Sequence, residues 1–153
     1  MDYVIPVYRV SLVREAGIPS DAYKFRNSAT VSTLLHTYLA DADREHFVIF
    51  FVDQKNRVTG VHTVSMGSLT ASVVHPREVF KAAILANAAA IVCGHNHPSG
   101  DVQPSREDRA TTKRLVEAGK LLGIEVLDHI IIGREGVYFS FADENILLSG
   151  CEF

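Results

Sequence analysis

The sequence has little cysteine, no tryptophan and no long apolar run. Its 153 residues include two cysteines, Cys93 and Cys151, and no Cys-x-x-Cys pair. A disulfide framework and a cysteine-rich zinc site are therefore excluded, and we expect free thiols. No stretch has the length needed to cross a bilayer, and the N-terminus has no secretory signal pattern. We therefore expect a cytoplasmic protein with no membrane partner.

The chain also has no excess of positive charge. Its formal net charge is −3, whereas domains that bind nucleic acid usually have a positively charged surface patch. One local exception is a basic stripe at near-helical spacing: Arg106, Arg109, Lys113 and Lys120. Such a stripe is more typical of a solvated helix face, so contact with nucleic acid has only weak support. The 47% hydrophobic and 22% charged composition is that of a globular domain.

Hydrophobic periodicity predicts a mixed β-sheet flanked by helices. Helical spacing of apolar residues favours helices at 28–39, 77–87 and 105–122, with Ile84 and Leu122 among the inward-facing residues. Strand patterns occur at 3–13, 45–52, 57–66, 69–74, 89–93, 124–132 and 137–141. We therefore predict an α/β (α+β) domain over residues 28–153, preceded by a strand and loop extension over residues 1–27.

The stretch from Gly94 to Asp108 carries the clearest chemistry. His95 and His97 follow an apolar strand, and residues i and i+2 of an extended chain point to the same side. A loop rich in proline and glycine returns the chain to a helix that opens at Ser105, with Asp108 one turn into it. Two imidazoles and one carboxylate with an open fourth position form the ligand set of catalytic zinc.

Each half of this pattern has a common structural explanation. Ser105-x-x-Asp108 is close to a helix capping box, and capping pairs are far commoner than metal sites. A lone His-x-His is more often a surface or core feature than a ligand pair. Their combination on a strand, a loop and a helix start favours the metal site, and the capping role is compatible with it.

These residues resemble a known family. His95-x-His97-Pro98, followed by the loop to Pro104 and then by Ser105-x-x-Asp108, matches the JAMM motif of the JAB/MPN metalloprotease superfamily. The run from His95 to Gly100 resembles the RadC family, long called DNA repair proteins. So do the segments 74–78 (VHPRE) and 127–133 (LDHIIIG). The resemblance covers residues 28 to 148 and implies the JAB/MPN fold, which is akin to cytidine deaminases.

The resemblance also implies roles for individual residues. In JAMM proteins a glutamate on an earlier strand is the general base, and Glu45 occupies the matching position in this chain. Without the resemblance, Glu45 would be interpreted as an ordinary charged residue at the start of a strand. Ser105 matches the family serine that stabilises the oxyanion. His95, His97 and Asp108 match the ligands of Zn²⁺, which lowers the pKa of a water toward neutrality.

Four other residues are open to more than one interpretation. Asp128-His129 interrupts an apolar strand, and could either orient a ligand imidazole or form a satisfied polar pair in the core. His75 precedes Pro76 and is favoured as a helix-entry residue over a ligand. Cys93 is expected to be a buried small residue.

Two functions follow as hypotheses. The first is a zinc-dependent hydrolase of the metallopeptidase or isopeptidase type, acting on an unknown peptide or protein conjugate. The alternative is a DNA-repair accessory or partner-binding protein whose metal site is not used for catalysis. Fuller RadC proteins carry a helix-hairpin-helix portion, and this chain resembles the short copies without one, which weakens the DNA hypothesis.

A zinc nucleobase deaminase would need His-x-Glu and Pro-Cys-x-x-Cys, which this sequence lacks. The oligomeric state cannot be predicted.

Overall fold

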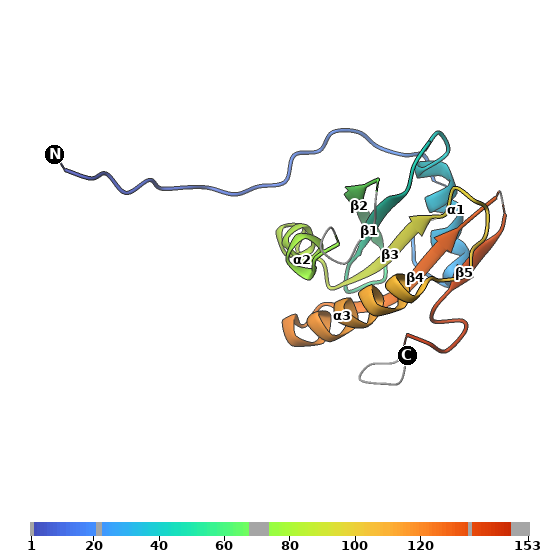
Figure 1. Cartoon of the computed structure of the whole chain (residues 1–153). Coiled ribbons are helices and arrows are strands. Elements are labelled where there is room, and N and C mark those ends of the chain that lie inside the picture. The colour runs from blue at the N-terminus through green and yellow to red at the C-terminus, as the bar shows by residue number, and fades with distance from the viewer. Residues whose placement is uncertain (1, 21–22, 68–73, 135, 148–153) are drawn as a thin grey trace.

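The computed structural model describes residues 2–20, 23–67, 74–134 and 136–147 (Figure 1). Its elements in chain order are α1 (Ser28–Tyr38), β1 (His46–Val52), β2 (Val58–Met66), α2 (Pro76–Leu85), β3 (Ala90–Asn96), α3 (Arg106–Leu122), β4 (Glu125–Ile132) and β5 (Tyr138–Ser140). The strands form one sheet in the order β2-β1-β3-β4-β5. Only the β3–β4 pair is parallel, which confirms the predicted mixed sheet. The strand predicted at 69–74 falls almost entirely outside the described residues.

The central strands are those whose sequences are apolar on both faces. Six of the seven residues of β1 are buried, from Phe47 to Val52, and all seven residues of β3 are buried. Side chains of a strand alternate between the two faces of a sheet, so a strand with no polar face must be covered on both sides. This places β3, and the histidines at its end, in the middle of the molecule.

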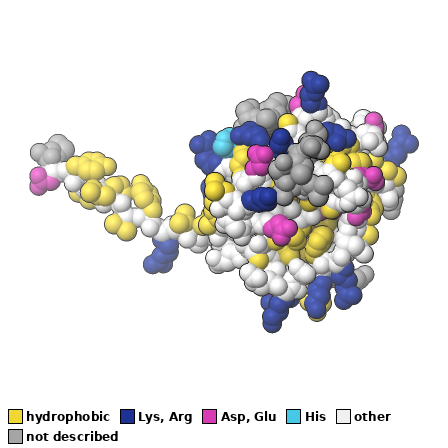
Figure 2. Space-filling view, turned by 90° about the horizontal axis from the view of Figure 1, so that it is seen from below, with side chains coloured by type: hydrophobic (Ala, Val, Ile, Leu, Met, Phe, Trp, Pro, Cys, Tyr) yellow, Lys and Arg dark blue, Asp and Glu magenta, His cyan; other side chains and the backbone are white. Residues whose placement is uncertain are grey.

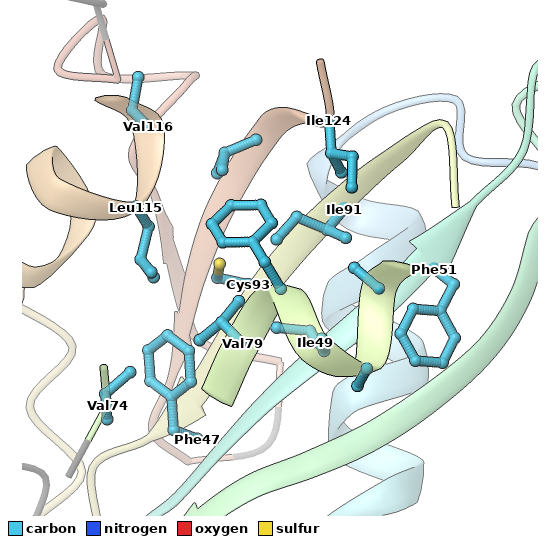
Figure 3. Packing of buried hydrophobic residues seen from close by; sticks show 14 residues of the cluster. Phe47, Ile49, Phe51, Val74, Val79, Ile91, Cys93, Leu115, Val116 and Ile124 are labelled. Carbon is cyan, nitrogen blue, oxygen red and sulfur yellow. The ribbon is translucent and has the colours of Figure 1, made fainter. Parts of the chain in front are cut away.

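Helices cover both faces of the sheet, as Figures 1 and 3 show. One apolar cluster joins α2 and α3 to the face that carries Phe47, Ile91 and Cys93. A second cluster joins Val31 and Leu35 of α1 to the opposite face. The Cys93 thiol lies inside the first cluster (Figure 3), where burial raises its pKa, which agrees with the expected buried residue.

The helices begin and end close to the predicted positions, but two residues predicted to face inward do not. Ile84 is 53% exposed and Leu122 is 48% exposed. In α3 the backbone of Gly119 lies close to the chain that follows the helix, because an added Cβ would lie 2.3 Å from the carbonyl oxygen of Ile124. Periodicity identifies the inner face of a helix but not how far the neighbouring element covers it. None of the described helices is long and apolar enough to span a membrane.

The strand predicted at residues 3–13 is wrong. Residues 2–20 have no regular secondary structure and run away from the domain, with large apolar side chains exposed (Figures 1 and 2). A strand requires a partner for its backbone groups, and sequence alternation supplies only the propensity. Within the described residues, the nearest pairing is an antiparallel bridge between Lys24 and Arg57.

Candidate metal centre

Three side chains from a strand, the loop after it and the next helix converge at the end of β3. His95 lies in β3, His97 directly follows the strand, and Asp108 lies in the first turn of α3. The two Nε2 atoms are 2.9 Å apart, and the Asp108 carboxylate oxygens lie 3.3 Å from His95 Nε2 and 3.2 Å from His97 Nε2. Among the described residues, these three form a group whose ligand atoms all lie within 4.8 Å of one another, which suits a metal ion.

Asp108 closes a capping box and faces the histidines at the same time. Its backbone N–H donates to Ser105 Oγ at 3.0 Å, and its Oδ2 accepts the Ser105 backbone N–H at 2.8 Å. Burial acts to raise the pKa of Asp108, but the hydrogen bonds from His95, His97 and the Ser105 N–H lower it well below its usual range. Asp108 therefore presents an ionised carboxylate to the histidines, and the capping box predicted for Ser105 and Asp108 is present.

His97 is held by backbone carbonyl groups. Its Nδ1 lies 2.7 Å from the Asp101 carbonyl oxygen, and its backbone N–H donates to the Ile132 carbonyl at 2.9 Å. Because a carbonyl can only accept, Nδ1 carries the hydrogen, and in a neutral imidazole Nε2 then holds a lone pair. The hydrogen bond with Asp108 raises the pKa of His97 above its ordinary value, with the buried location acting against it.

His95 is buried and touches a third histidine. Its ring stacks on Phe47 with centroids 6.0 Å apart, and its Nδ1 lies 2.7 Å from Nε2 of His129. His129 is fully buried, and burial, followed by the charge on His95, lowers the pKa of His129 far below its ordinary value. His129 is thus a buried histidine with both ring nitrogens hydrogen-bonded, and one of its partners is the imidazole of a candidate ligand.

Asp128, next in sequence, faces a different set of groups. Its carboxylate accepts the backbone N–H groups of His129 and Ala142, at 2.7 and 3.0 Å, and the Ser140 hydroxyl at 2.6 Å. Burial raises the pKa of Asp128, although these hydrogen bonds oppose the rise. Asp128 is thus a satisfied polar group that ties β4 to the chain after β5.

His75 also has a structural partner, as favoured from its position before a proline. It is the N-cap of α2, and its Nδ1 accepts the backbone N–H of Arg77 at 3.0 Å.

The expected base, Glu45, lies next to this centre. The antiparallel β1–β3 pairing places Phe47 opposite His95. Glu45 precedes Phe47 by two residues, and residues two apart in an extended chain point to the same side. Glu45 is partly exposed and its charge contributes to the raised pKa of His97. Ser105 is exposed beside Asp108, and its hydroxyl hydrogen is not used by the cap.

A cavity of about 610 Å³ opens beside His97. It lies between the C-terminal end of α1, which contributes His36 and Thr37, and the loop His97–Gly100, and Arg134 also lines it. Of the three converging side chains, only His97 lines it. The cavity is therefore a neighbour of the centre, with room for part of a larger molecule.

The donor set fits a divalent cation. With a hydrogen on Nδ1 of His97, its Nε2 lone pair points at the second Nε2 atom and at the carboxylate of Asp108. Electron-rich atoms packed this closely need a positive charge between them, supplied by a proton or a metal ion. Two imidazole nitrogens and one carboxylate are ligands that zinc accepts, and three protein ligands leave a position for reaction.

Comparison with known proteins points to one family. A family model described as "RadC-like JAB domain" matches residues 25–146. A UPF0758 protein of Rubrobacter xylanophilus is 51% identical over 139 residues, which cover 91% of this chain and 59% of that protein. A UPF0758 protein of Methanosarcina mazei is 43% identical over 144 residues, covering 94% and 62%. The chain thus spans about 60% of the length of these relatives. Their names state no activity.

Proposed function

Because this chain belongs to the RadC-like JAB domain family, we propose that it is a zinc-dependent hydrolase of amide bonds. The observation that carries the proposal is the convergence of His95, His97 and Asp108 at the end of β3. Zinc bound by these residues would supply Lewis acidity, which lowers the pKa of a water and polarises a carbonyl group.

We assign Glu45 as the general base. Its charge acts on His97, and from there its carboxylate would take a proton from the attacking water and pass it to the leaving amine. We assign Ser105 as the oxyanion donor. Removal of one donor from an oxyanion hole costs about 3–4 kcal/mol in other hydrolases. The capping bond that its Oγ accepts from Asp108 fixes the oxygen and leaves the hydroxyl hydrogen free to donate.

The substrate class is a peptide or an isopeptide conjugate. The cavity between α1 and the loop His97–Gly100 adjoins one ligand and offers space for a chain that continues away from the cleaved bond. Its lining is both polar and apolar and includes the exposed Arg134. These features suit an extended peptide segment better than a compact, purely apolar ligand.

The test combines metal analysis with two paired substitutions. Purified protein is loaded with zinc, its metal content is measured, and hydrolysis of a library of peptides and isopeptide conjugates is followed. We expect Glu45→Gln to retain zinc and lose activity, and His97→Ala to lose both. The matched controls are the exposed residues Glu117 and His62, changed to Gln and Ala respectively. We expect both controls to behave as wild type.

The same variants separate catalysis from the alternative partner role. If a cellular phenotype of the gene survives both Glu45→Gln and His97→Ala, the metal site is not used for chemistry and the hydrolase proposal fails. Absence of zinc from wild-type protein under zinc-replete conditions would refute the metal assignment itself.

A further inference from the structure

A chain of buried hydrogen bonds runs behind the metal centre and returns to it. It leads from His95 Nδ1 to His129 Nε2 at 2.7 Å, and from His129 Nδ1 to the hydroxyl of Thr112. The Thr112 hydroxyl donates to the backbone carbonyl oxygen of Asp108 at 2.8 Å. The side chains of Thr112, His95 and His129 are at most 1% exposed, so water does not compete for these bonds. The chain connects two candidate ligands through residues that lie on α3 and β4.

The direction of every bond in this chain follows from its last acceptor. The Asp108 carbonyl cannot donate, so the single hydroxyl hydrogen of Thr112 points at it. The Thr112 oxygen must then accept from Nδ1 of His129, which leaves Nε2 of a neutral His129 without a hydrogen. That Nε2 can only accept, so Nδ1 of His95 carries the hydrogen. When it is neutral, His95 therefore presents a bare Nε2 to the centre.

The ring of His129 is also fixed against rotation. It stacks on Phe141 with centroids 4.7 Å apart and an interplanar angle of 11°, and it meets the edge of Phe47 at 5.5 Å. The backbone N–H of His129 is bonded to the buried Asp128 carboxylate. Packing therefore holds the imidazole in the plane in which its two nitrogens meet their partners, and exchange of tautomers would break both bonds.

We infer that Thr112 and His129 are positioning residues that set the tautomer of His95 and so keep its Nε2 available as a metal ligand. The inference rests on the proposed metal-binding function and adds two residues to it. Neither residue touches the position of the metal. Their effect passes through His95, as expected for residues that hydrogen bond to the far nitrogen of a ligand imidazole.

Thr112→Val is the decisive variant because it keeps the branched shape and removes only the hydroxyl. Without this acceptor, His129 is free to carry its hydrogen on Nε2, which would oblige His95 Nδ1 to accept and place a hydrogen on His95 Nε2. We expect zinc affinity to fall by about 10- to 100-fold. The matched control is Thr111→Val, the same change at the neighbouring buried threonine, which is outside this hydrogen-bond chain. We expect it to keep wild-type affinity.

The experiment reads affinity and tautomers separately. Zinc dissociation constants come from competition with a chromophoric chelator. The histidine tautomers come from ¹⁵N chemical shifts of metal-free protein in alkaline solution, in which wild type should show hydrogens on Nδ1 of both His95 and His129. We expect Thr112→Val to change both readouts. Unchanged affinity and unchanged tautomers in a folded Thr112→Val protein would overturn the inference.

A second pair of variants tests His129 directly. His129→Gln offers an amide oxygen that can accept from His95 Nδ1, whereas His129→Leu offers none. We expect Gln to retain more zinc affinity than Leu, and equal losses in two folded variants would contradict a positioning role. If wild-type protein binds no zinc, the proposed function fails, but the tautomer measurement still decides whether Thr112 and His129 set the state of His95.

Discussion

Gly133 offers a test of how tightly the loop that carries His97 is fixed. A Cβ built on Gly133 would lie 2.3 Å from the carbonyl oxygen of Gly100 and 2.9 Å from a methyl group of Val102. The backbone of Gly133 is not in the left-handed region, so only this contact opposes a side chain. Relief of the clash requires a movement of about 1 Å, and overpacking of this kind costs about 1–3 kcal/mol. The backbone oxygen cannot rotate away, so the loop must move.

The cost of Gly133→Ala should divide between folding and metal binding. The Gly100 N–H donates to the His97 carbonyl, and the His97 N–H donates to Ile132, so displacing the loop displaces a ligand. Strain that the metal-free protein avoids by moving the loop returns as weaker zinc binding. We therefore expect losses in unfolding free energy and in zinc-binding free energy that together amount to about 1–3 kcal/mol.

Calorimetry of metal-free protein and chelator competition measure the two parts of this cost. If all of it falls on folding, the melting temperature drops by about 2–12 °C. If all of it falls on binding, zinc affinity drops by about 5- to 150-fold. Gly17→Ala is the control, since its added Cβ would meet only an ordinary contact of 3.4 Å with Arg14. A Gly133→Ala protein that matches wild type in both measurements refutes the reasoning.

Three further predictions concern other parts of the molecule. Because Asp108 raises the pKa of His97, protonated His97 stabilises the metal-free protein below about pH 6.5, and this stabilisation is lost as pH rises through the raised pKa. Calorimetry of the metal-free protein should show this decline. Chelator competition should show stronger zinc binding over the same range, because the proton leaves the ligand. In a Cys151→Ser background, the buried Cys93, whose thiol pKa is raised by burial, should react with a thiol reagent only after unfolding. Removal of residues 1–17, which are exposed except for the undescribed Met1, should leave the melting temperature unchanged within about 1 °C, whereas a larger drop would mean that this segment packs on the domain.

The sequence predicted most of the sheet because its central strands have an unambiguous composition. A strand such as 46–52, apolar on both faces, is compatible only with a covered central position. The N-terminal segment shows the limit of the same approach. Its alternation resembles that of β2, but pairing depends on a partner that a local pattern does not identify. The exposed Ile84 shows a similar limit for helices, because coverage depends on the neighbouring elements.

The convergence of His95, His97 and Asp108 was predictable because all three lie within fourteen residues joined by a short loop. The His129 contact was not, because it depends on the parallel pairing of β3 and β4, which places Cys93 opposite His129. A polar pair inside an apolar strand indicated a special position, but it did not distinguish the two members. Asp128 holds the backbone near β5, while His129 faces the ligand.

A signal for the support of the metal centre was nevertheless present in α3. Ser105, Asp108 and Thr112 follow one another at spacings of three and four, so they lie on one face of the helix. Thr112 is polar but buried, and it is followed on the buried side of α3 by Leu115 and Val116 of the core. A buried polar side chain costs free energy unless it is hydrogen-bonded. All three side chains have hydrogen-bond partners. Ser105 caps the helix, Asp108 accepts from the cap and faces the imidazoles, and Thr112 links Asp108 to His129. The first two turns of α3 therefore orient the Asp108 carboxylate and the His95 imidazole together. A substitution at any of the three positions should change the zinc affinity of the site.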